Sequence, residues 1–280
     1  MSRNMYMRFP GGKAKALTLS YDDGVEQDIR LIDILDKHGI KATFNINSGS
    51  YAPEDKQYKP GQVHRRMSKS RCTELYNKNG HEVAVHAYTH PFLEKLPASG
   101  VAYEIVKDRE NLEEQFGCIV RGMAYPYGTY NDTVVEVLRQ CGIVYSRTTK
   151  TTEKFTVPTD WLRLDPTCHH KNPRLMELAE KFVADEPNRA PELFYLWGHS
   201  YEFEENDNWN VIEEFADYIG GKEDIWYANN IEIYDYVKAY ESLICSVDMN
   251  TVTNPSAKTV WVFKNKETYE IAPGETVKLA

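Results

Sequence analysis

The fold is decided by residues 16–47, which read ALTLSYDDGVEQDIRLIDILDKHGIKATFNIN. Ala16–Tyr21 is a short apolar run that predicts a buried strand. Gln27–His38 carries apolar residues at helical spacing, and Gly39 follows where a helix commonly ends. Lys41–Asn47 predicts a second strand. A strand, a helix and another strand in direct succession form a βαβ unit, so we expect a parallel sheet.

This alternation continues along most of the chain. Further strands are predicted at Glu82–His86, Arg121–Tyr125, Val144–Arg147, Leu193–Gly198 and Ile225–Ala228. Further helices are predicted at Ser68–Asn79, Gly100–Phe116, Asp132–Gln140, Pro173–Ala184, Trp209–Tyr218 and Glu232–Leu243. Roughly seven or eight such units in about 245 residues favour an α/β barrel over an open sheet.

The pattern changes after Leu243. Lys258–Leu279 predicts two or three short strands, with a turn at Pro273-Gly274. A segment of about 35 residues is too small to bury a core of its own. We therefore expect a barrel at residues 1–245 and a small β appendage, packed on it, at 246–280.

Composition narrows the classes of partner. The chain has 33 Lys plus Arg against 42 Asp plus Glu, which gives a formal net charge of −9. This balance argues against nucleic acid and anionic membranes, because both favour clustered basic charge. No apolar run approaches the ~20 residues of a membrane span, and five cysteines without CxxC do not suggest a disulfide framework. Without a visible apolar leader we expect a cytoplasmic protein, or a secreted one whose leader was removed. The oligomeric state is not predicted.

Two predicted strands end in residues that can bind a metal. In a parallel sheet these ends lie at one edge, where function collects. Asp22 and Asp23 follow the first strand, and alternating side chains let one bind a metal while the other acts as a base, although an Asp-Gly turn is the simpler interpretation. His86 and His90 follow the third strand. Asp23, His86 and His90 together form a three-ligand set with an open position, as in catalytic zinc sites. Cobalt, iron or manganese would also suit these ligands.

Two more strand ends carry groups that suit hydrolysis. Backbone N–H groups exposed after residues 124–128 (AYPYG) could stabilise an oxyanion, or the segment is a plain turn. His199 follows the strand Leu193–Gly198 and is a candidate general acid. Nineteen tyrosines and five tryptophans indicate either a sugar ligand or an aromatic core.

Five motifs resemble those of the polysaccharide deacetylase family, which has the NodB-homology fold of carbohydrate esterase family four. They occur in the family's order as LSYDDG, HAYTH, AYPYG, TDW and LWGH, within Lys15 to Leu243. The resemblance implies a distorted (β/α) barrel of seven or eight units. It also implies metal-dependent removal of acetyl groups, N-acetyl more than O-acetyl, from an acetylated oligosaccharide or amino sugar. Zinc is the expected metal, with cobalt, iron, manganese or nickel as alternatives.

The resemblance also implies residue roles. Asp22 would be the general base, and His199 the general acid. Asp23, His86 and His90 would hold the metal, and the backbone N–H of Tyr127 would complete the oxyanion hole.

The chain departs from the family pattern at two motifs. Ala124 stands where the family has an Arg that contacts the base. We expect Arg163 to replace it, ahead of Arg121 and Arg147. The fourth motif matches loosely, so we expect Asp165, ahead of Asp160, to orient His199.

Substrate contacts are less specific in the sequence. The candidate sugar-binding residues are Tyr127, Trp161, Trp197, Tyr201 and Trp226. His169 and His170 either line the pocket or lie on the surface.

Two other functions fit some of these residues. Ala124 could mark a non-catalytic sugar-binding protein on a deacetylase scaffold. An Asp-His-His set also occurs in non-haem Fe(II) oxygenases, although those usually use a β scaffold.

Overall fold

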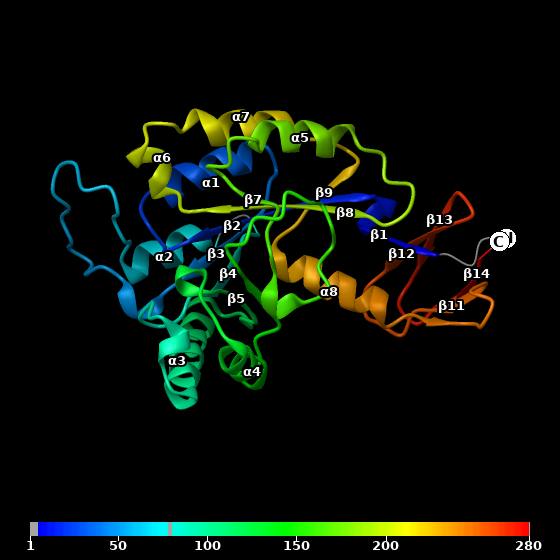
Figure 1. Cartoon of the computed structure of the whole chain (residues 1–280), viewed down its shortest axis with the longest axis horizontal. Coiled ribbons are helices and arrows are strands. Elements are labelled where there is room, and N and C mark those ends of the chain that lie inside the picture. The colour runs from blue at the N-terminus through cyan, green and yellow to red at the C-terminus, as the bar shows by residue number, and fades with distance from the viewer. Residues whose placement is uncertain (1–4, 78–79, 280) are drawn as a thin grey trace.

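The computed structural model describes residues 5–77 and 80–279. Its centre is an eight-stranded sheet in the order β6-β5-β4-β3-β2-β8-β7, with β9 paired to β2 (Figure 1). All neighbouring strands in it are parallel. The strands are β2 (Lys15–Asp22), β3 (Ala42–Ile46), β4 (Glu82–Val85), β5 (Gly122–Ala124), β6 (Tyr145–Arg147), β7 (Cys168–His169), β8 (Glu192–Gly198) and β9 (Ile225–Tyr227).

The sheet curls, and the chain between β6 and β7 links its two edges. Leu164 N donates to Ser146 O at 3.0 Å, and Thr148 N donates to Leu164 O at 2.9 Å. Thr167 N then donates to Tyr195 O of β8 at 2.9 Å. The result is a distorted barrel, which confirms the predicted α/β fold class.

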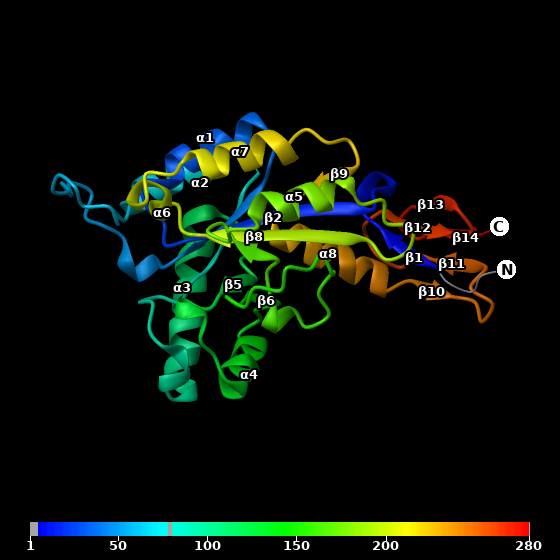
Figure 2. The same cartoon turned by 45° about the horizontal axis from the view of Figure 1, so that its top comes forward.

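Eight α-helices in the described residues surround the sheet. They are α1 (Asp28–Lys37), α2 (Lys69–Tyr76), α3 (Ala98–Phe116), α4 (Asp132–Gln140), α5 (Leu175–Ala184), α6 (Tyr201–Glu205), α7 (Asn210–Ile219) and α8 (Asn230–Glu241). Helices α1, α5 and α7 lie side by side, and α3 and α4 pack together on another side (Figures 1 and 2). The predicted end of α2 at Asn79 lies outside the described residues. None of these helices is long and apolar enough to cross a membrane.

Strand β2 is buried along its whole length and separates an apolar layer from a polar one. Leu17, Leu19 and Tyr21 belong to the core that includes α1 and α7. The alternate side chains enter a hydrogen-bonded network inside the barrel: Thr18 Oγ1 donates to Asn230 Oδ1 at 2.8 Å, and Ser20 accepts from Asn45 Nδ2 at 2.8 Å. Because side chains alternate along a strand, the next inward residue is Asp22.

Six short strands lie at the end of the molecule opposite α6 (Figures 1 and 2). They form two three-stranded sheets, β1-β12-β13 and β10-β11-β14. Their bounds are β1 (Tyr6–Arg8), β10 (Ile244–Cys245), β11 (Thr251–Thr253), β12 (Val260–Lys264), β13 (Glu267–Ile271) and β14 (Thr276–Lys278). Their buried valines pack against Ala239 of α8.

Sequence reasoning missed β1, β7, β10, β11 and α6, all of which are short. Strand β1 precedes the barrel in the chain yet pairs with β12, so Tyr6–Arg8 take part in the appendage. The boundary between the two predicted units, at residues 245 and 246, stays a prediction. The outer ends of these units, residues 1–4 and 280, lie outside the described residues.

Candidate active site

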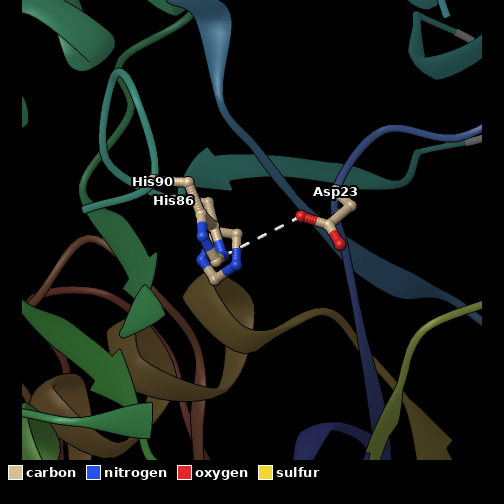
Figure 3. Close-up of side chains that lie close together, drawn as sticks. All are labelled: Asp23, His86 and His90. Carbon is tan, nitrogen blue, oxygen red and sulfur yellow. Dashed lines mark ion pairs between the residues drawn. The ribbon is translucent and has the colours of Figure 1, made fainter. Parts of the chain in front are cut away.

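The three predicted metal ligands lie together beyond the ends of β2 and β4. One ligand atom from each of Asp23, His86 and His90 lies within 4.8 Å of the other two. Figure 3 shows both imidazole rings beside the Asp23 carboxylate, with His90 Nε2 4.0 Å from Asp23 Oδ1. Asp23 and His90 both have positive φ, at 85° and 59°, so the backbone turns sharply at each residue.

The two histidines have the protonation that a metal ligand needs. His86 Nδ1 lies 2.8 Å from the backbone oxygen of Ala124. A donor role at Nδ1 leaves the Nε2 lone pair free for a cation. Burial lowers the pKa of His86, and burial together with His86 lowers the pKa of His90 to about 4. Both rings are therefore neutral near pH 7, which fits a divalent metal.

A loop that the sequence analysis did not single out also holds Asp23. Arg66 Nη2 lies 2.9 Å from Asp23 Oδ1, and Arg66 Nη1 donates to the Asp23 backbone oxygen at 2.7 Å. His64 Nε2 lies 3.3 Å from Asp23 Oδ2. Burial alone would raise the pKa of Asp23, but His64 and Arg66 hold it well below its usual range. The carboxylate is thus ionised before any metal arrives.

Asp22 lies inside the barrel beside this cluster. Its Oδ1 accepts from Asn45 Nδ2 at 2.8 Å, and its Oδ2 accepts from Arg147 Nη2. His199 Nε2 lies 3.7 Å and His86 Nε2 3.8 Å from the same Oδ2. Burial opposes ionisation of Asp22, but Arg147, and then the two histidines, lower its pKa below the usual value.

The prediction that Arg163 contacts the base is wrong. Arg163 pairs with Asp160 at 2.9 Å and with Asp132 at 2.7 Å on the surface. Arg147 takes the position instead, and only 1% of it is exposed. The strand register explains why Arg147 can take this position, because Arg147 of β6 lies directly opposite Ala124 of β5. The signal in the sequence was an arginine at the carboxyl end of a short predicted strand, Val144–Arg147.

The prediction that Asp165 orients His199 is also wrong. Asp165 accepts from Thr148 Oγ1 at 2.6 Å and pairs with Lys150 at 3.1 Å. Glu202 lies beside His199 instead, with 3.5 Å between Glu202 Oε2 and His199 Nδ1. Burial alone would lower the pKa of His199, but Glu202, Asp22 and Asp23 raise it.

Tyr127 lies at the exposed edge of the site. It occupies a one-turn 3-10 helix, Pro126–Gly128, with φ of 58°. Its ring stacks on Phe92 at a centroid distance of 4.0 Å and lies 4.4 Å from the His90 ring. The two aromatic side chains are 54% and 38% exposed, so they form an open aromatic surface beside the metal ligands. The oxyanion role of the Tyr127 N–H stays a prediction.

The other predicted sugar-binding residues divide into two groups. Trp161 and Trp226 are wrong, because they pack in a core with Tyr234 and with Phe9, respectively, away from the metal ligands. Trp197 is near the site but 8% exposed, with its ring 4.2 Å from the Arg147 guanidinium. The ring centroids of Tyr201 and His199 are 5.3 Å apart, so Tyr201 remains a candidate for sugar binding.

We predict that the chain binds about one divalent ion at Asp23, His86 and His90. Zinc bound after desalting, measured by elemental analysis, should fall in Asp23→Ala. The loss of affinity should exceed the 10- to 100-fold that is typical of an outer-shell partner, because a direct ligand is removed. Asp33→Ala, an exposed acid on α1, is the control and should bind as the parent does. Unchanged zinc affinity in Asp23→Ala would refute the site.

Comparison with known proteins agrees with the motifs. Residues 10–146, about half of the chain, match the family model for polysaccharide deacetylases. The peptidoglycan-N-acetylglucosamine deacetylase PgdA of Listeria monocytogenes is 30% identical over 124 residues, covering 44% of this chain and 23% of that protein. The chitooligosaccharide deacetylase of Sinorhizobium fredii is 28% identical over 138 residues, covering 48% of this chain and 56% of that protein. In each case the match spans less than two thirds of the relative.

Solved structures share the fold. A Mycobacterium smegmatis protein described as a polysaccharide deacetylase aligns with a TM-score of 0.56 and 16% identity, over 84% of this chain and 94% of that one. A family 4 carbohydrate esterase from Streptomyces lividans aligns with a TM-score of 0.50 and 16% identity, over 77% and 93%. With its DDG, HAYTH and AYPYG motifs inside residues 10–146, the chain belongs to the polysaccharide deacetylase family.

Proposed function

We propose that this protein is a metal-dependent hydrolase that removes acetyl groups from a carbohydrate. The observation that carries the proposal is that a candidate base, a candidate acid and a candidate metal ligand lie close together. The ionised carboxylate of Asp22 lies 3.7 Å from a candidate acid, His199, and 3.8 Å from a candidate metal ligand, His86. Zinc is the metal that the Asp-His-His donor set favours.

Each residue has a role that its surroundings support. When bound, a divalent ion supplies Lewis-acid polarisation of a carbonyl oxygen and of water. Asp22, kept ionised by Arg147, accepts the proton of the attacking water. His199 gives a proton to the leaving nitrogen or oxygen as its bond to the acetyl carbon breaks. The products are acetate and a free amine or hydroxyl. The backbone N–H of Tyr127 donates to the oxyanion.

An N-acetylated oligosaccharide is the favoured substrate. The matched relatives from Listeria and Sinorhizobium are named for deacetylation of peptidoglycan N-acetylglucosamine and of chitooligosaccharides. The exposed Tyr127–Phe92 pair offers a flat apolar surface on which the C–H face of a pyranose can pack.

Neither alternative gains support from the site. A sugar-binding protein without activity was suggested by Ala124, yet Arg147 restores the contact to Asp22. An Fe(II) oxygenase was suggested by the ligand set, which here lies on a parallel β/α barrel.

Acetate release tests the proposal directly. We expect the zinc-loaded protein to release acetate from N-acetylglucosamine oligomers faster than from O-acetylated xylan. Asp22→Asn should lower kcat by about 10²- to 10⁴-fold, the usual contribution of a general base, while zinc stays bound. Removing the metal with a chelator should abolish turnover, and adding zinc should restore it. Full activity in Asp22→Asn would exclude Asp22 as the base.

Arg147 should control the acid limb of the pH profile. Arg147→Ala removes the cation that lowers the pKa of Asp22. The base then stays protonated to higher pH, so the acid limb of kcat/KM moves upward. Leaving Asp22 buried without its partner should also lower the free energy of unfolding by about 3–5 kcal/mol. The double variant Ala124→Arg/Arg147→Ala should recover part of both losses, because the two positions are register partners.

Urea unfolding and pH–rate profiles measure these effects. If the acid limb of Arg147→Ala stays in place, Arg147 does not set the ionisation of Asp22. If the double variant is no better than the single one in either assay, the register argument fails.

Phe92 should contribute to substrate binding through Tyr127. Phe92→Ala removes the ring behind Tyr127 and should raise KM for an N-acetylglucosamine oligomer by about 3- to 10-fold, as expected for one aromatic contact. The value of kcat should change little, because Phe92 does not contact the reacting groups. Tyr103→Ala, an aromatic residue of α3 with 59% exposure, is the matched control. An equal KM in the two variants would argue against an aromatic subsite.

A further inference from the structure

The cluster of His169, His170, Lys171 and Glu202 has no place in the mechanism described above. The other three residues surround the carboxylate of Glu202. His169 Nε2 lies 3.1 Å and His170 Nε2 3.0 Å from Glu202 Oε2, while Lys171 Nζ lies 2.8 Å from Glu202 Oε1. His199 Nδ1 approaches the same Oε2 at 3.5 Å. The carboxylate therefore connects this cluster to the proposed general acid.

Strand pairing and local packing place this cluster close to His199. Strand β7 pairs with β8 so that His169 lies opposite Trp197, two residues before His199. The ring of His170 packs on Phe203 at 4.1 Å and is 2% exposed. A side chain at Gly198 would place its Cβ 2.1 Å from His170 Nδ1, so only glycine leaves room for this ring. Glu202 lies on α6, one helical turn after His199.

The contacts favour a donor role for His169. The backbone N–H of Lys171 donates to His169 Nδ1 at 3.1 Å. An accepting Nδ1 places the proton of a neutral ring on Nε2, which is the atom that faces Glu202. This tautomer, and the ammonium of Lys171 on the other carboxylate oxygen, both disfavour a metal ion at the cluster even though the spacing of its ligand atoms would admit one.

We propose that His169, His170 and Lys171 fix the Glu202 carboxylate, and that Glu202 in turn orients His199 with its Nε2 toward Asp22. Glu202 is thus a positioning residue for the acid step. We call this arrangement, in which the three residues hold Glu202 and Glu202 orients His199, the relay. The inference rests on the proposed function only for the identity of the reaction.

Charge at Glu202 also affects the protonation of His199. The titratable groups around His199 are Asp22 at the end of β2, Asp23 directly after that strand, Glu202 and Tyr201 from α6, and His169 from β7. Burial opposes ionisation of Glu202, yet the three histidines and Lys171 hold its pKa far below the usual value. The carboxylate thus stays anionic across the working pH range and stabilises the imidazolium form of His199.

Glu202→Gln tests the relay because it keeps the shape and removes the charge. His199 should lose its proton at lower pH, so the basic limb of kcat/KM should move down by about one pH unit, a usual effect of one nearby charge. The value of kcat should fall at least about 10-fold, because a misoriented acid loses much of its contribution. Glu202→Asp keeps the charge and should hold the basic limb near its original place. Glu205→Gln, an exposed neighbour on α6, should behave as the parent.

A second measurement does not depend on turnover. The ring ¹⁵N shifts of His199 in the zinc-loaded protein should titrate at lower pH in Glu202→Gln than in the parent or in Glu205→Gln. If the parent releases no acetate from any glycan, the proposed function fails, while this titration still decides the relay.

Two outcomes would overturn the relay. One is an unchanged His199 titration in Glu202→Gln. The other is a second equivalent of zinc in the parent that is lost in Glu202→Gln, which would make the cluster a metal site. A parent and a Glu202→Gln protein that bind the same single equivalent, together with the shifted titration, would support it.

Discussion

The buried ion pair between Arg147 and Asp22 is the interaction on which the site depends. Both side chains are almost wholly inaccessible, at 1% and 3% exposure. Taking two charges out of water is expensive unless each is paired and its remaining polar atoms are satisfied. Asn45 meets this need at Asp22 Oδ1, and it also binds Ser20. The polar lining of the barrel is thus the environment that lets a charged base stay ionised inside a protein.

The need to pair buried charges also applies to two adjacent carboxylates, those of Asp22 and Asp23, which point in different directions. Asp22 ends the inward row of β2 and keeps strand geometry, so its side chain enters the barrel. Asp23 has a φ of 85°, which carries its carboxylate out of the strand and toward His86 and His90. A positive φ is unfavourable for a residue with a Cβ. Arg66 offsets that penalty by binding both the backbone oxygen and the side chain of Asp23.

Sequence periodicity predicted the repeating strands and helices of the barrel well, because each long element carries its own pattern. It could not predict contacts that depend on strand register. Arg147 replaces an arginine absent at Ala124 only because β5 and β6 align these residues, and Arg163, nearer to a motif, binds Asp132 instead. Glu202 was missed because α6 is a five-residue helix without periodicity. Trp161 and Trp226 were misassigned because residue type alone does not distinguish an exposed aromatic ring from a core one.

Arg147 and Glu202 prepare the base and the acid, respectively, for the same pH. Arg147 lowers the pKa of Asp22, so that carboxylate is ionised from low pH upward. Glu202 and Asp22 raise the pKa of His199 against the effect of burial, so that ring keeps its proton to higher pH. The range in which Asp22 is ionised while His199 is protonated therefore widens at both ends. The neighbouring charges of the pair also act on each other, since an ionised Asp22 favours a protonated His199 and the reverse. A site built in this way needs no further proton carrier between the attack of water and the departure of the leaving group.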